Sequence, residues 1–110
     1  MWLYTQHGFY SIVAHRDQPG RFLVRARRQI DLDNLRSLAG LPASIESTPD
    51  ADYHFRLTIT AAELARVMTV LGNTVDYPNF KNRIAARPDQ ADRIHIYHDI
   101  WDETNRLSGH

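Results

Sequence analysis

Arginines alternate with apolar residues along the segment 21–28, which reads Arg-Phe-Leu-Val-Arg-Ala-Arg-Arg. In a β-strand, alternate side chains point to opposite faces, so Phe22, Val24 and Ala26 would share one face and Arg25 and Arg27 the other. A second strand with the same alternation is expected over residues 53–59. The two strands predict a basic sheet face that comprises Phe9, Leu23, Arg25, Arg27, His54 and Arg56.

This basic face has two interpretations, of which the first is binding of single-stranded nucleic acid. Domains that bind single-stranded nucleic acid stack bases on aromatic rings and hold phosphates with arginine. Here Phe9 is the one ring that the sequence offers for stacking, and no RNA-recognition signature accompanies it. The alternative is that the arginines meet a protein partner, pair with carboxylates of the C-terminal segment, or face water.

Histidine and aspartate recur one helical turn apart near the C-terminus, at His95, His98, Asp99 and Asp102. Imidazole and carboxylate groups at this spacing could ligate a divalent metal. No His-Glu-x-x-His signature is present, so we interpret this stripe as electrostatic and expect neither a metal site nor a cofactor.

A second group of unusual residues begins at Asp76-Tyr77-Pro78-Asn79. Asn79 can cap a helix and Phe80 is a candidate core residue, which makes a structural interpretation of this group the simplest one. In the functional interpretation, Tyr77 and Lys81 lie at the rim of a pocket. The candidate site residues of this region, which we call the secondary cluster, are Tyr77, Asn79, Phe80, Lys81, His98 and Trp101.

The composition narrows the range of functions. The 110 residues have a formal net charge of zero and no cysteine, which excludes disulfides and thiolate chemistry. No glycine-rich phosphate loop and no nucleophile–base arrangement can be recognised. We therefore expect a non-enzymatic protein, with catalysis by His54, His95 and His98 as the third hypothesis. No apolar run is long enough to span a membrane, which leads us to expect a cytoplasmic protein.

The elements that must position these residues can be read in order. Residues 8–16 and 21–28 are predicted to form a hairpin, because Asp17-Gln18-Pro19-Gly20 has the composition of a type II turn. Residues 1–6 would extend the first strand or pack as an arm. A helix capped by Asp31 or Asp33 should end at Gly40, followed by a short edge strand over residues 43–48.

The second half is predicted to be mostly helical. In the strand 53–59, Tyr53, Phe55, Leu57 and Ile59 are expected to face inward. Thr60 and Glu63 form a capping box for the next helix, which Gly72-Asn73 ends. A further helix should begin within residues 76–79 and break at Pro88, and a last one should start at Asp89 or Asp92.

These elements predict one α+β domain over residues 1–110. We expect a ferredoxin-like fold with permuted ββαββα order, whose four-stranded antiparallel sheet has the spatial order 1-2-4-3. Residues 1–87 would form the sheet and its packing helices, which cover one face. Residues 88–110 would form a C-terminal helical extension and a polar tail.

Several landmarks occur together along the chain: Val24-Arg25-Ala26-Arg27, the Thr-Pro-Asp-Ala-Asp-Tyr of 48–53, the Asp-Tyr-Pro-Asn-Phe-Lys of 76–81, and Tyr97-His98-Asp99-Ile100-Trp101. With the opening Met-Trp-Leu and residues 8–13, they make the chain resemble a small family of uncharacterised bacterial proteins. The resemblance implies a stand-alone bacterial domain and no particular activity. Relatives often lack proline at position 78, which implies that Pro78 adjusts a helix start.

Our leading hypothesis from the sequence is a small, soluble binding or regulatory domain. It would act through protein–protein contacts, including self-association, and not at a membrane. Single-stranded nucleic-acid binding by the arginine face is the runner-up, and a metal-dependent or acid–base enzyme comes third.

Overall fold

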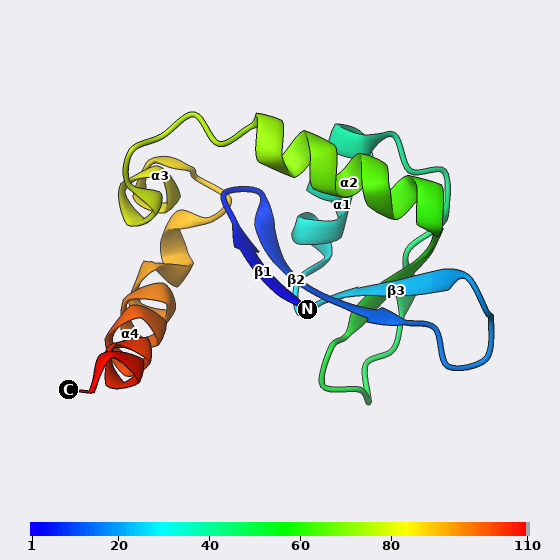
Figure 1. Cartoon of the computed structure of the whole chain (residues 1–110), viewed down its shortest axis with the longest axis horizontal. Coiled ribbons are helices and arrows are strands. Elements are labelled where there is room, and N and C mark those ends of the chain that lie inside the picture. The colour runs from blue at the N-terminus through cyan, green and yellow to red at the C-terminus, as the bar shows by residue number, and fades with distance from the viewer. Residues whose placement is uncertain (110) are drawn as a thin grey trace. The chain divides into compact units, whose positions relative to one another are not determined.

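The structure of the protein is a computed structural model that describes residues 1–109 (Figure 1). Its contacts divide the chain into two compact units, Met1–Asp76 and a second unit that begins at Tyr77. This division lies earlier than the one expected after residue 87. We expected a polar tail that reaches residue 110, and His110 lies outside the residues that the structure describes.

The first unit is built on one antiparallel sheet. Its five strands are β1 (Trp2–Thr5), β2 (Gly8–Ala14), β3 (Arg21–Ala26), β4 (Glu46–Ser47) and β5 (Phe55–Thr60). They lie in the order β1-β2-β3-β5-β4. The expectation of an α+β fold is therefore confirmed, whereas a four-stranded ferredoxin-like fold with order 1-2-4-3 is not confirmed.

The additional strand is β1, which we had expected only as an extension or an arm. A tight turn separates it from β2. The Thr5 side chain accepts hydrogen bonds from the backbone N–H groups of His7 (3.1 Å) and Gly8 (3.2 Å). Because this turn reverses the chain after only four strand residues, the segment pairs with β2 as its neighbour and does not continue it.

The predicted hairpin between β2 and β3 is confirmed. The N–H of Arg21 donates to the Gln18 carbonyl (3.1 Å), and Gly20 has a φ of 77°. A type II turn needs a positive φ at its third residue, which glycine adopts without strain, and Pro19 supplies the φ that suits the second.

Two helices follow the sheet strands in the first unit, α1 (Gln29–Ala39) and α2 (Ala61–Asn73). The prediction that Asp31 or Asp33 caps α1 is wrong, since the helix begins earlier, after Arg28, and has no side-chain cap. The Asp31 carboxylate instead accepts the backbone N–H of Phe9 (3.0 Å). The end of α1 at Gly40 (φ 62°) and the capping box of α2 are both as expected.

Both helices pack on the same face of the sheet (Figure 1). That face and the helices enclose a core of buried apolar side chains: Tyr10, Ile12, Val24, Ala26, Leu32, Leu35, Ala39, Leu41, Leu57, Ile59, Val67 and Leu71. The alternation of β3 and β5 thus buries Val24 and Leu57, which are register partners on neighbouring strands. It leaves Arg25 and Arg56 on the opposite face.

The second unit is helical. It contains α3 (Phe80–Ala86), a 3-10 turn (Ala91–Arg93), α4 (Ile94–Thr104) and a second 3-10 turn (Asn105–Ser108). The side chain of Asn79 accepts the N–H of Asn82 (2.9 Å) as the N-cap of α3. The helix therefore begins at Phe80, just after the range 76–79 in which its start was expected, and Pro78 precedes it. The last helix also starts later than Asp92, because residues 91–93 adopt the tighter 3-10 geometry.

Within residues 1–109, no helix combines the length and the apolar character needed to cross a bilayer.

Candidate functional site

The candidate site is the open face, by which we mean the face of the sheet opposite to α1 and α2. Alternation along the strands places polar and aromatic side chains there, while their neighbours enter the core. Within residues 1–76 no helix covers this face. It carries Trp2, Tyr4, Phe9, Ser11, Val13, Leu23, Arg25, Arg56 and Thr58, joined at one end by Arg27 and Tyr53.

Four aromatic rings gather at one end of the open face, and we call them the ring cluster. The Phe9 ring stacks on Tyr4 (centroids 4.3 Å apart, planes 6° apart) and meets the edge of Trp2 (6.3 Å) and the tilted ring of Tyr53 (6.3 Å). Trp2 remains 65% exposed. Burial and the neighbouring Tyr53 raise the pKa of Tyr4 above its usual value, although Arg27 opposes the shift.

Among these rings, only Phe9 was expected on this face. Tyr53 was expected to face inward from β5; it is buried (5% exposed), but its ring contacts Phe9, Arg25 and Arg27. The strand begins two residues later, so its alternation does not extend back to Tyr53. Trp2 and Tyr4 were missed because β1 was not recognised as a strand. The alternation Trp-Leu-Tyr before the Gln6-His7 turn was the available signal.

The ring of Tyr53 positions two of the predicted arginines. The guanidinium carbons of Arg25 and Arg27 lie 4.7 Å and 4.5 Å from the centre of this ring. Arg25 also donates to the Ser11 hydroxyl (2.7 Å), and Arg27 donates to the backbone carbonyl of Asp52 (2.7 Å). Aromatic and neutral polar groups thus hold both cations in place without neutralising their charge.

Arg56, the remaining arginine of the predicted face, lies directly opposite Arg25. Arg25 and Arg56 are register partners on β3 and β5, and both point to the open face. Arg56 donates through Nε to the Thr48 hydroxyl (3.1 Å). Within residues 1–76 no carboxylate forms an ion pair with Arg25, Arg27 or Arg56, and the buried Nε of Arg25 has no acceptor there. Like charges at opposed positions destabilise a sheet.

Beside the arginines, the open face is hollowed. The hollow has a volume of about 630 Å³ and lies between the tip of the β2–β3 hairpin and β4. Val13 and Leu23 supply apolar surface, and Leu23 lines the hollow together with Arg25 and Arg56. The full lining is Val13, Ala14, His15, Arg16, Asp17, Gln18, Leu23, Arg25, Glu46, Arg56 and Thr58.

His54 is the predicted site residue that the structure does not bring to this group. It precedes β5, and its exposed ring meets the edge of Phe55, with the centroids 6.4 Å apart. Phe55 belongs to the inward-facing set of β5. The reason is again the late start of the strand, which breaks the alternation that would have aligned His54 with Arg56.

In the second unit, the secondary cluster forms two ring groups. Phe80 lies between Tyr77 (6.1 Å) and Tyr97 (5.6 Å), while His98 stacks on Trp101 (5.7 Å). The Lys81 ammonium lies 4.4 Å from the centre of the Trp101 ring and 3.4 Å from His98 Nδ1. The remaining member, Asn79, serves as the cap of α3.

The His/Asp stripe lies on α4, and all four of its side chains are exposed. In residues 1–109 no three histidine, aspartate or glutamate side chains gather as metal ligands would. Near its end a polar hollow of about 410 Å³ is lined by Asp102, Glu103, Asn105 and Arg106.

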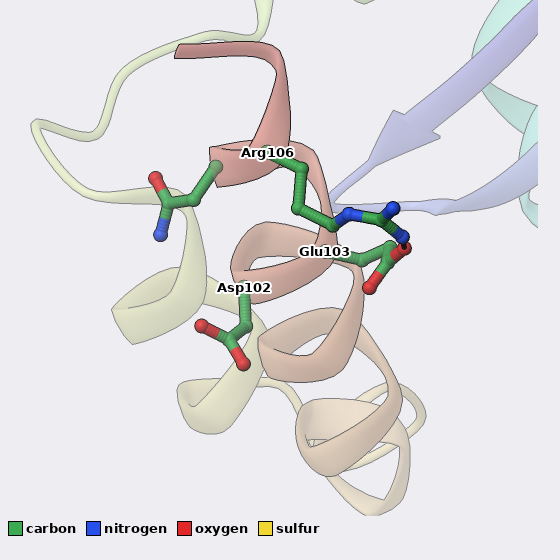
Figure 2. Close-up of a pocket in the computed structure, with 4 residues that line it drawn as sticks. Asp102, Glu103 and Arg106 are labelled. Carbon is green, nitrogen blue, oxygen red and sulfur yellow. Dashed lines mark hydrogen bonds and ion pairs between the residues drawn. The ribbon is translucent and has the colours of Figure 1, made fainter. Parts of the chain in front are cut away.

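Figure 2 shows this hollow at the end of α4. Arg106 reaches toward Glu103, and their ion pair is 2.6 Å long, whereas the Asp102 side chain points away from the pair. Both partners are mostly exposed, and exposed pairs contribute little stability. Only polar and charged residues line this hollow, and it is a weaker candidate than the one on the open face, which includes Val13 and Leu23.

Comparison with known proteins adds no assignment: no protein-family model, no curated protein and no solved structure matches this chain.

Proposed function

We propose that this protein binds single-stranded nucleic acid on the open face of its sheet. The observation that carries the proposal is the juxtaposition of Arg25 and Arg56 on neighbouring strands, where neither arginine forms an ion pair with a carboxylate of residues 1–76. A cross-strand pair of like charges costs stability, so an anion that lies over both strands would relieve it.

The ring cluster identifies the class of anion. Proteins that bind single strands combine a positively charged groove for the phosphates with aromatic rings on which bases stack. Trp2 is largely exposed next to Phe9, and both lie on the same face as Arg25. Base–aromatic stacking contributes about 1–3 kcal/mol per base, which a neutral chain can use without a strong overall charge.

Self-association through this face, part of our leading hypothesis from the sequence, receives less support. A two-fold symmetric contact places the same patch of each copy against the other. The interface would then contain Arg25 and Arg56 of both copies, and like charges brought together oppose association. A protein partner would need an acidic surface that also accommodates the ring cluster.

Titration of short single-stranded oligonucleotides at several salt concentrations tests the proposal. The Arg25→Gln/Arg56→Gln double variant should bind more weakly and lower the slope of log K against log salt by about 1.4, since each phosphate contact to a single strand contributes about 0.7. Trp2→Ala should weaken binding at every salt concentration by about 1–3 kcal/mol and leave this slope unchanged.

The second unit provides matched controls. Trp101 is 52% exposed, and Arg106 is an exposed arginine paired with Glu103. Trp101→Ala and Arg106→Gln remove an exposed indole and an exposed guanidinium from the second unit and should leave affinity and slope nearly as they are. Binding that is absent at low salt, or that the control variants weaken as much as the open-face variants, contradicts the proposal. Sedimentation of the same variants would reveal a protein assembly that depends on the open face.

A further inference from the structure

The hollow on the open face lies beyond the arginines as seen from the ring cluster. Along β2, Phe9 belongs to the rings, Ser11 contacts Arg25, and Val13 lines the hollow. Four residues of strand separate Phe9 from Val13, a distance of about 13 Å. The open face is thus divided into an aromatic section, a cationic section and a hollow, and one ligand can occupy all three.

The hollow has the size of a small-molecule site and a mostly polar lining. Its volume of about 630 Å³ lies within the range of known ligand pockets. Val13 and Leu23 offer an apolar surface suited to the face of a planar ring, and Thr58 adds a hydroxyl. Arg25 and Arg56 border it, so a phosphate bound to them would place the attached nucleoside at its entrance.

Glu46 is the residue that suggests which base would fit. It lies on the edge strand β4 as the register partner of Arg56 and lines the hollow. Within residues 1–76 its carboxylate forms neither a hydrogen bond nor an ion pair. A carboxylate accepts hydrogen bonds and donates none, so it suits a base that presents an amino group.

We infer that the hollow holds one nucleobase with an exocyclic amino group, next to a phosphate held by Arg25 and Arg56. This inference rests on the proposed function and specifies the preferred strand. Cytosine presents an amino group where uracil presents a carbonyl oxygen, and that oxygen would face the Glu46 carboxylate without a hydrogen between them. Strands that contain cytosine should therefore bind more tightly than uracil-containing strands.

The test compares oligo(dC) with oligo(dU) of equal length at neutral pH and fixed salt, because the two bases share one ring and differ at one edge. On this edge cytosine has a C4 amino group beside the N3 acceptor, and uracil has a C4 carbonyl beside an N3–H. The protein should bind oligo(dC) at least about fivefold more tightly, the lower end of what a base contact discriminates. Glu46→Gln should bring the ratio of the two affinities close to one. Glu103→Gln removes an exposed carboxylate of the second unit and should preserve the ratio.

The outcomes separate this inference from the proposed function. Equal affinity of the unmodified protein for both strands overturns the base preference and leaves nucleic-acid binding standing. A preference that survives Glu46→Gln also overturns it, because another group then reads the base. If neither strand binds, both proposals fail. A circular dichroism spectrum of Glu46→Gln that matches the parent ensures that a lost preference does not reflect a lost fold.

Discussion

The opposition of Arg25 and Arg56 can be measured in the protein without any ligand. We predict that a double-mutant cycle with Arg25→Gln and Arg56→Gln will show unfavourable coupling between the two arginines. Each single variant loses favourable contacts and gains relief from repulsion. In the double variant the relief is gained only once, so the double variant should be destabilised by more than the sum of the single variants.

The expected size follows from the contacts of each side chain. Arg25→Gln removes a hydrogen bond to Ser11 and the contact with the Tyr53 ring, each of which contributes about 0.5–1 kcal/mol. Arg56→Gln removes the hydrogen bond to Thr48, which contributes a similar amount. Like charges at directly opposite positions on neighbouring strands repel each other by roughly 0.2–1 kcal/mol. Arg25 and Arg56 have different hydrogen-bond partners, Ser11 and Thr48, so each single variant removes contacts that the other does not share. The coupling then reports mainly the repulsion between the two arginines, and we expect it to be about 0.5 kcal/mol.

Urea unfolding of the parent, both single variants and the double variant gives the four free energies that the cycle needs. The measurement should be made at low salt, where the Debye length is about 30 Å, and at about 1 M salt, where it is about 3 Å. The coupling should fall to near zero at high salt. A double variant that is destabilised by less than the sum, or a coupling that salt leaves unchanged, would refute the reasoning.

Three further predictions concern the stability of the two units, two in the unit that carries the open face and one in the second unit. Gly8→Ala should destabilise the protein by about 1–3 kcal/mol in urea unfolding, because a Cβ at position 8 would overlap the buried Asp31 side chain; a variant as stable as the parent would contradict this packing. A hydrogen bond from the backbone N–H of Thr60 lowers the pKa of Glu63 in the folded protein. The ionised Glu63 side chain therefore stabilises the fold above the unfolded-state pKa of about 4.3, and this contribution is lost as pH falls through the lower folded-state pKa. Glu63→Gln should therefore lose less stability than the parent on acidification, and parallel pH profiles would argue against the capping box. Asn79→Ala should cost about 0.5–2 kcal/mol in thermal unfolding because α3 loses its N-cap, whereas Asn82→Ala, inside the same helix, should cost less.

Local chemistry in the sequence determined the elements whose signals lie within a few residues. Pro19-Gly20 specified the hairpin turn, Thr60 and Glu63 specified the start of α2, and Gly40 specified the end of α1. Each depends on backbone angles or hydrogen bonds between near neighbours, and the chain around them does not alter these requirements. The alternation that separates Val24 from Arg25 was equally legible, since a strand with one buried face permits a single register.

Tertiary structure decided what depends on contacts between distant segments. Asp31 was read as a helix cap, but α1 begins two residues before it, and its carboxylate accepts the N–H of Phe9 in β2. Tyr53 was assigned to the core because its own strand was expected to begin there; in the structure it supports Arg25 and Arg27. The candidate site is formed by side chains from all five strands, so its ring cluster and its hollow exist only once long-range pairing has set the register.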